Sequence, residues 1–144
     1  MPSIDSNALA SNYIDLLDAI YELESSSGKN PKAYVMNKVG ALGGYQMRKS
    51  TYEGDLQKMY PSKWASVPFE KAMKNDIVAR EAANDYLSLL NRYLTSFDVV
   101  PSEDTLLAAY HQGAGNVAKG NIGPIGKEYV QKGLEFIARK RKNG

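Results

Sequence analysis

A long helical pattern between Phe69 and Leu94 constrains the fold of this chain more than any other feature. Apolar side chains recur there every three or four residues, and neither proline nor glycine interrupts the stretch. This spacing places the apolar side chains on one face of a helix, which other parts of the chain must cover. The positions on that face are Met73, Ile77, Arg80, Ala83, Leu87, Leu90 and Leu94. The pattern predicts a central helix and favours a mainly α fold.

A second helical pattern runs from Asn7 to Glu24 and ends at the turn-forming residues 25–31. One stripe of this helix comprises Tyr13, Leu17, Ile20 and Glu24. The carboxyl group of Glu24 is therefore expected at the end of an apolar face. Glu22 lies close to half a helical turn away from Glu24, so its side chain is expected to point into solvent.

Shorter elements are expected in the remaining segments. Residues 30–61 combine glycines with mixed polar and apolar residues, which predicts a loop with short helical or extended pieces. Ser102 is placed to begin a helix that Gly113 ends. A last helix is expected from about Ile125 to Arg139, followed by basic residues up to Lys142.

Length and composition limit the chemistry that is open to this chain. At 144 residues it has the size of one domain, so residues 1–144 are expected to form a single domain. The absence of cysteine excludes disulfides, thiolate zinc sites and cysteine nucleophiles. The single histidine, His111, rules out a metal site built from several histidines. No metal or cofactor is expected.

Net charge and hydropathy limit the kinds of partner that this chain is expected to bind. The formal net charge of +2 gives too weak a field to indicate nucleic acid as the main partner. Apolar runs are too short to span a bilayer, so membrane insertion is not expected. The first residues have neither the basic region nor the apolar core of a signal peptide, and none is expected in this chain.

Glu24 is the most informative candidate for chemistry. A carboxyl group at the end of an apolar stripe and beside a loop is expected to be partly desolvated, which raises its pKa toward the range of a general acid. Glycosidic bond cleavage needs such a proton donor. The alternative is that Glu24 sits in the last turn of a surface helix, and spacing alone leaves both interpretations open.

Three motifs, in this order, resemble those of soluble lytic transglycosylases and goose-type lysozymes. Glu24-Ser25 resembles the Glu-Ser of the catalytic motif, and residues 40–46 (Gly-Ala-Leu-Gly-Gly-Tyr-Gln) resemble the Gly-Ala-x-Gly-Leu-Met-Gln loop. Residues 108–117 (Ala-Ala-Tyr-His-Gln-Gly-Ala-Gly-Asn-Val) are similar to Ala-Ala-Tyr-Asn-Ala-Gly-Pro-Gly-x-Val. Tyr129-Val130 is close to the Tyr-Val that begins the last helix of the family. The resemblance implies a lysozyme-like domain with glycine-rich loops around a sugar-binding cleft.

The resemblance also implies roles for individual residues. Glu24 would be the single catalytic acid/base, and the hydroxyl of Tyr110 would reach the catalytic centre. Tyr45 stands where the family has methionine, and its ring is expected to stack on a sugar face. The residues expected to bind substrate are Ser25, Gly43, Gly44, Tyr45, Gln46, Tyr110, His111 and Tyr129.

One departure from goose-type lysozymes bears on the mechanism. The aspartates thought to position a hydrolytic water in those enzymes correspond here to Asn37 and Arg48, neither of which can act as a base. An inverting hydrolase needs a second carboxylate roughly 6.5–9.5 Å from the first. Glu53 and Asp55 are the nearby candidates. Without such a base, the C6 hydroxyl of the substrate is the expected nucleophile.

The resemblance therefore implies a lytic transglycosylase that cleaves the MurNAc-GlcNAc β-1,4 bond of peptidoglycan and leaves 1,6-anhydro-MurNAc ends. Its expected partners are glycan strands of the bacterial cell wall in the periplasm. A lysozyme-type hydrolase of the same fold, and a non-catalytic peptidoglycan-binding or virion structural protein, remain alternatives. The small size and the lack of a leader favour a phage endolysin or a virion-associated protein that contacts other virion proteins.

Two of these features also have ordinary structural interpretations. His111 near a helix end is more typical of a helix cap or of a partner for the helix dipole than of a substrate contact. The basic residues 139–142 are typical of a solvated chain end, although they also favour an anionic wall.

Overall fold

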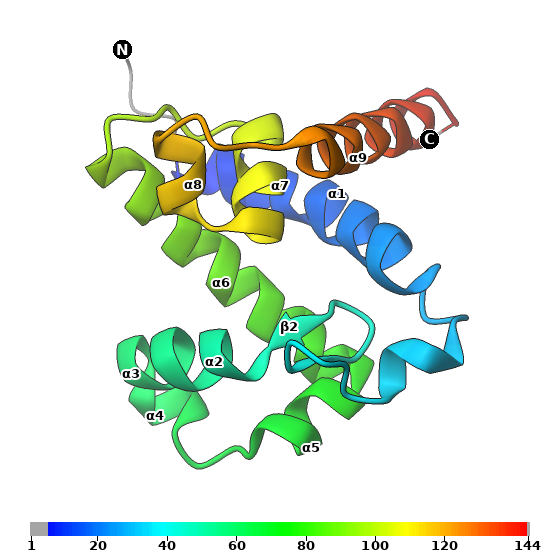
Figure 1. The fold of residues 1–144 in the computed structure, drawn as a ribbon, viewed down its shortest axis with the longest axis vertical. Coiled ribbons are helices and arrows are strands. Elements are labelled where there is room, and N and C mark those ends of the chain that lie inside the picture. The colour runs from blue at the N-terminus through cyan, green and yellow to red at the C-terminus, as the bar shows by residue number, and fades with distance from the viewer. Residues whose placement is uncertain (1–5, 144) are drawn as a thin grey trace. The chain divides into compact units, whose positions relative to one another are not determined.

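The computed structural model describes the backbone of residues 6–143 and the side chains of residues 13–143. Over these residues the chain is mainly helical with one two-stranded antiparallel sheet, which confirms the predicted fold class (Figure 1). The helices before the sheet are α1 (Ser6–Ser25) and the 3₁₀ helix η1 (Pro31–Tyr34). The sheet pairs β1 (Ala41–Leu42) with β2 (Met47–Arg48).

The remaining elements are helical. A continuous helical stretch consists of α2 (Lys49–Thr51), the π-helix η2 (Tyr52–Leu56) and α3 (Gln57–Met59). It is followed by α4 (Pro61–Trp64), α5 (Phe69–Lys74) and α6 (Asp76–Ser96). The last three helices are α7 (Glu103–Gln112), α8 (Ala114–Ala118) and α9 (Pro124–Asn143).

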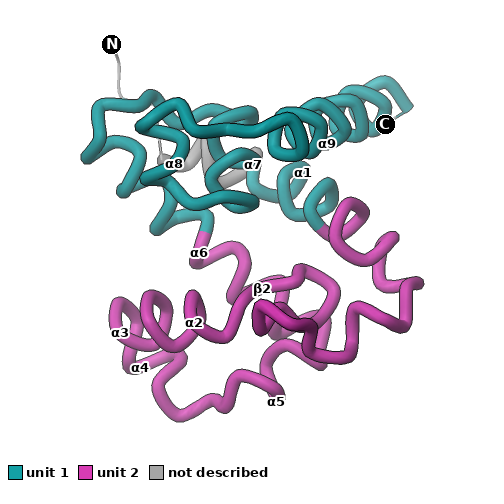
Figure 2. Tube along the Cα trace, in the orientation of Figure 1, with its two compact units in different colours: residues 1–20, 87–144 teal, residues 21–86 magenta. Residues whose placement is uncertain are grey.

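The chain divides into two compact units, which Figure 2 shows in different colours. The first unit comprises residues 1–20 and 87–144, and the second comprises residues 21–86. Both boundaries fall inside helices, one near the end of α1 and the other in the middle of α6. Each unit contains buried apolar side chains of its own, such as Leu106 and Leu107 in the first and Tyr52 and Leu56 in the second.

The predicted central helix is two helices rather than one. α5 ends at Lys74, and Asn75 adopts an extended backbone conformation before α6 begins. The side-chain oxygen of Asn75 accepts hydrogen bonds from the backbone N–H groups of Ile77 and Val78 at 3.0 and 3.2 Å. A side chain that satisfies these first donors starts a new helix. Ile77, expected on the buried face, is consequently 84% exposed in the first turn of α6.

α1 follows its sequence pattern closely. Tyr13, Leu17 and Ile20 are buried along one side, and Glu22 is exposed as expected. After Ser25 the chain leaves the helix through Ser26 and Ser27, both with positive φ (52° and 53°). Two such residues in succession cannot continue a right-handed helix, so α1 ends directly after Glu24 and Ser25.

The segment between α1 and α5 has short helices and the small sheet, as the glycine-rich sequence predicts. Side chains hold its later part together. The hydroxyl of Tyr52 donates to the carbonyl of Val67 at 2.8 Å, and the amide of Gln57 donates to the carbonyl of Trp64 at 3.0 Å. The indole N–H of Trp64 in turn donates to Asp85 of α6 at 2.8 Å.

The C-terminal helices begin and end where local signals place them. Ser102 caps α7 in a reciprocal pair with Thr105, and Gly113 ends that helix with a φ of 89°. α9 is longer than expected and includes the basic residues. Two of these do not form a solvated end, because Lys140 forms ion pairs with Asp15 and Asp18, and Arg141 pairs with Asp15 and Glu103.

Among residues 6–143, no helix is both long enough and apolar enough to cross a membrane.

Candidate active site

Glu24 lies in the last turn of α1, in the second unit. Its side chain is half-buried, at the end of the buried stripe formed by the preceding turns of the helix. Glu22, on the other side of the helix, accepts a hydrogen bond from the hydroxyl of Ser27 in the exposed turn. Of the two carboxylates, Glu24 is the one with a partly desolvated environment.

Ser25 fixes the turn that follows Glu24. Its hydroxyl donates to the carbonyl of Tyr21 at 3.0 Å and accepts from the backbone N–H of Gly28 at 2.9 Å. The carbonyl of Ser25 accepts from the N–H of Asn30 at 3.0 Å. Ser25 is only 1% exposed, and backbone groups engage its hydroxyl. This geometry does not favour the expected contact with substrate. The side chain supports the site by holding the chain next to Glu24.

Gly43 and Gly44 are buried, and each permits a close approach. A Cβ added to Gly43 would lie 2.1 Å from the carbonyl oxygen of Met73, and the φ of Gly43 is 89°. A Cβ added to Gly44 would lie 2.5 Å from Cε1 of Tyr21. Glycine is therefore required at both positions for packing, whether or not their backbone lines a sugar cleft.

Gln46 anchors the same loop from within. Its side-chain amide donates to the carbonyls of Ala33 and Gly43, both at 2.9 Å. Its side-chain oxygen accepts from the amide of Asn37 at 3.5 Å. Gln46 has a φ of 48° and a half-buried side chain. Because Ala33 belongs to the 3₁₀ helix η1, the side-chain amide of Gln46 joins the loop to that helix.

Tyr45 does not present its ring as expected for sugar stacking. The side chain is 2% exposed, and its ring stacks on that of Tyr21 with centroids 4.9 Å apart and planes at 15°. Its hydroxyl accepts a hydrogen bond from Arg80 at 3.2 Å. The sequence pattern could show that an aromatic residue stands here, but it could not show that Tyr21 would cover the ring.

The other expected binding residues belong to the first unit. Tyr110 and His111 lie in the last turn of α7, and Tyr129 lies in the second turn of α9; all three are half-buried. The rings of His111 and Tyr129 pack together with centroids 4.4 Å apart. The structure thus gathers the expected residues into two groups, one in each unit.

A comparison with protein-family models matches residues 7–124 to the transglycosylase SLT domain. The chain belongs to this family. Members of the family are lytic transglycosylases that act on peptidoglycan, and the SLT domain has a lysozyme-like, all-α fold. The matched range includes Glu24, Gln46 and Tyr110 and ends before Tyr129. A search of curated proteins and a search of solved structures each found no match.

The match gives this SLT domain a function of the lytic transglycosylase type, exercised on the cell wall. Glu24 as acid/base, the form of the product and a phage origin stay predictions. In the described part of the chain, no three histidine or acidic side chains lie close enough together to hold a metal ion.

The positions of the possible second carboxylates in the SLT domain are now defined. Glu53 is exposed and Asp55 is half-buried, and both lie in the π-helix η2 of the second unit. Asn37 has a structural function instead, because its side-chain oxygen accepts from the N–H groups of Val39 and Ala41 at 3.1 and 2.9 Å. Arg48 is exposed at the end of β2.

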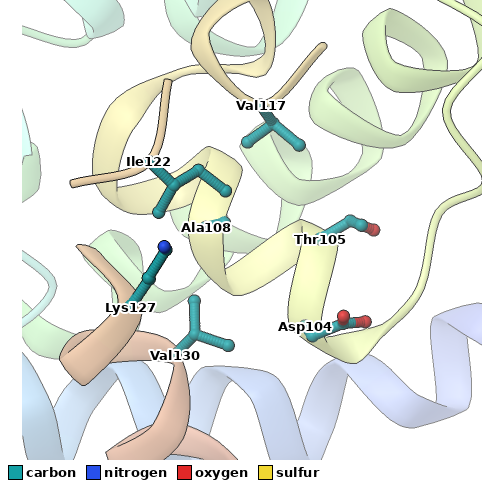
Figure 3. A pocket seen from close by; sticks show the side chains of 7 residues that line it. All are labelled: Asp104, Thr105, Ala108, Val117, Ile122, Lys127 and Val130. Atoms are coloured by element: carbon teal, nitrogen blue, oxygen red, sulfur yellow. The ribbon is translucent and has the colours of Figure 1, made fainter. Parts of the chain in front are cut away.

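The first unit of the SLT domain also contains a small, largely apolar cavity of about 180 Å³ (Figure 3). It lies among α7, α8 and α9 and includes none of the expected site residues. The side chains that line it are Asp104, Thr105, Ala108, Val117, Ile122, Lys127 and Val130.

Sequence reasoning missed a cluster built on Tyr21, which lies three residues before Glu24 on α1. The hydroxyls of Tyr21 and Tyr34 both donate to the carboxylate of Asp76, at 2.6 and 2.7 Å. The hydrogen bond to Asp76 raises the pKa of Tyr21, and burial, followed by the bond to Asp76, raises the pKa of Tyr34. The three residues come from α1, η1 and α6, so no local spacing signal could have found them.

Proposed function

We propose that this SLT domain cleaves the MurNAc-GlcNAc β-1,4 bond of peptidoglycan with Glu24 as its single acid/base. The observation that carries the proposal is the position of Glu24. A half-buried carboxyl group ends the apolar stripe of α1, inside the range matched to the family, and a buried serine holds the turn after it. Partial removal from water favours the protonated carboxyl group that a general acid needs.

The proposed reaction has two proton transfers and consumes no water. The Glu24 carboxyl group donates its proton to the glycosidic oxygen as the bond from that oxygen to C1 of MurNAc breaks, which releases the GlcNAc hydroxyl. The resulting carboxylate accepts the proton of the C6 hydroxyl while the C6 oxygen bonds to C1. The product is a 1,6-anhydro-MurNAc end, and Glu24 is protonated again.

Substrate contacts in this proposal are divided among the expected residues. Tyr110, His111 and Tyr129 contact the glycan. Gly43, Gly44 and Gln46 maintain the loop that lines the sugar cleft, and this assignment is supported by the close packing of that loop. Residues 1–144 act as a single catalytic domain, and the chemistry needs no metal or cofactor.

Mass spectrometry of muropeptides released from purified peptidoglycan tests the reaction. The native protein is expected to release anhydro-MurNAc products. Glu24→Gln keeps the shape of the side chain but removes the acid, so it should abolish release. Glu22→Gln is the matched control, since Glu22 is exposed two residues earlier on α1, and it should release the same products as the native protein.

Other outcomes separate the alternatives. Products one water heavier would identify a lysozyme-type hydrolase and would direct attention to Glu53 and Asp55 as the second carboxylate. Unchanged release by Glu24→Gln would refute the assignment of Glu24. If no protein releases fragments while a control enzyme digests the same substrate, the result favours a non-catalytic peptidoglycan-binding or virion structural protein.

A further inference from the structure

We propose that Tyr21 is a positioning residue for Glu24 and that Asp76 holds it in place. This inference rests on the proposed function, because it assigns a role toward the proposed acid. Tyr21 precedes Glu24 by three residues on α1, and residues three apart lie on neighbouring parts of a helix surface. A displacement of Tyr21 therefore moves the turn of helix that carries Glu24.

Both ends of Tyr21 are held. Its carbonyl accepts hydrogen bonds from the Ser25 hydroxyl at 3.0 Å and from the N–H of Ser27 at 3.1 Å, the two residues that shape the turn after Glu24. Its hydroxyl donates to the carboxylate of Asp76 at 2.6 Å. The side chain thus connects the end of α1 to the first residue of α6, 55 positions along the chain.

The ring of Tyr21 lies against the turn that follows α1 and against the loop of residues 40–46. Tyr45 stacks on one face of the ring, and Gly44 lies so close that an added Cβ would be 2.5 Å from Cε1. On the hydroxyl end, a Cβ at Gly28 would lie 2.3 Å from the Tyr21 oxygen. Gly28, in the turn after Ser25, and Gly44, in the loop of residues 40–46, therefore both make room for this one side chain.

The carboxylate of Asp76 is well suited to hold the hydroxyl of Tyr21 in place. Hydrogen bonds to an ionised acceptor are stronger than those between neutral groups, and Asp76 accepts one from each of two tyrosines. Asp76 begins a long helix, α6, where the helix dipole favours a negative charge. The pKa values of Tyr21 and Tyr34 are raised, so both hydroxyls keep the protons that they donate.

The test compares Tyr21→Phe with Tyr34→Phe. Each variant removes one hydroxyl from the same carboxylate, but only Tyr21 lies on α1. Tyr21→Phe keeps the ring that stacks on Tyr45. We expect Tyr21→Phe to lower kcat about tenfold with little change in KM, since a misplaced acid slows the chemical step rather than binding. Both Phe variants should lower the thermal midpoint of unfolding by similar amounts. Tyr34→Phe, however, should leave kcat within about twofold of the native value.

A double-mutant cycle with Asp76→Leu tests whether Tyr21 acts through Asp76. If it does, the double variant Tyr21→Phe/Asp76→Leu should have nearly the same kcat as Asp76→Leu alone. Asp76→Asn keeps an acceptor oxygen, so it should retain part of the activity that Asp76→Leu loses. All variants are assayed at a temperature at which circular dichroism shows them folded. If Asp76→Leu does not fold, the comparison of the two Phe variants decides alone.

Two results would overturn the inference: a native kcat for Tyr21→Phe, or equal losses of kcat in the two Phe variants. Either would make the cluster merely stabilising. The Glu24→Gln variant is run in parallel. If it remains active, the proposed acid is wrong, and that result differs from any pattern produced by the tyrosine variants.

Discussion

Single residues in the loop from Gly43 to Gln46 show how backbone conformation restricts sequence. Gly43 has a φ of 89°, a value that side chains with a Cβ rarely adopt. A Cβ at this position would meet the backbone carbonyl of Met73 in α5, which cannot rotate away as a flexible side chain could. Gly54, by contrast, lies in the helical stretch with open space around the position of a Cβ.

These two glycines make a matched pair of predictions. Gly43→Ala should destabilise the protein by about 3 kcal/mol, because it combines an unfavourable φ with a clash against backbone. Gly54→Ala should leave stability unchanged or raise it by up to about 1 kcal/mol, since alanine favours helix. Urea unfolding monitored by circular dichroism measures both changes. Equal stability of the two variants would contradict the packing that is described for Gly43.

At the scale of elements, α9 is attached to other helices of the first unit by charges as well as by packing. Ile137 is buried, while Lys140 and Arg141 reach acidic residues of α1 and α7. Asp15 is shared between the two cations, and its hydrogen bond with Lys140 is the largest cause of its lowered pKa. α9 begins at Pro124, where the range matched to the family ends.

Removing Lys140 should weaken this attachment in a salt-dependent way. Lys140→Ala is expected to cost about 1 kcal/mol of unfolding free energy at low salt and less at high salt, where partly exposed charges are screened. Lys142→Ala, which changes an exposed lysine two residues later, should cost less than about 0.5 kcal/mol at either salt concentration. Urea titrations at two salt concentrations provide the comparison.

The same ion pairs predict a direction for the pH dependence. A carboxyl group whose pKa is lowered in the folded state stabilises the fold above its unfolded pKa of 3.8, and this contribution is lost as the pH falls through the folded value. The native protein should therefore lose more stability than Lys140→Ala between neutral pH and pH values below 3.8. Parallel losses in the two proteins would show that Asp15 is not stabilised by Lys140.

At the scale of the whole molecule, two compact units share two helices. α1 and α6 each contribute residues to both units, so neither unit consists of elements that belong to it alone. The second unit contains Trp64, which is 2% exposed and is the single tryptophan in the sequence. Its fluorescence therefore reports on the second unit, whereas far-ultraviolet circular dichroism reports on helices throughout the chain.

Because shared helices cannot unfold in one unit without loss of structure in the other, the two signals should change together. We expect Trp64 fluorescence and circular dichroism to give the same urea midpoint, as two-state unfolding requires. A fluorescence midpoint clearly apart from that of circular dichroism would show that the units unfold independently.

The sequence alone determined the parts of this protein that depend on neighbours along the chain. Helical spacing predicted α1, and Ser102 and Gly113 marked the limits of α7, because caps and turns act within a few residues. Short motifs around Glu24, Gln46 and Tyr110 indicated the family that the comparison with family models shows. The break at Asn75 was missed, since a single asparagine within an amphipathic pattern is a weak signal against the helical period.

Tertiary structure alone decided which side chains meet. The sequence could not show that Tyr21 covers Tyr45, that Asp76 accepts from two tyrosines, or that Lys140 is ion-paired rather than solvated. Each of these contacts joins residues that are distant in the sequence. The physical reason is that the burial, partners and charge environment of a side chain depend on the elements folded against it. Periodicity within one element does not indicate which other elements those are.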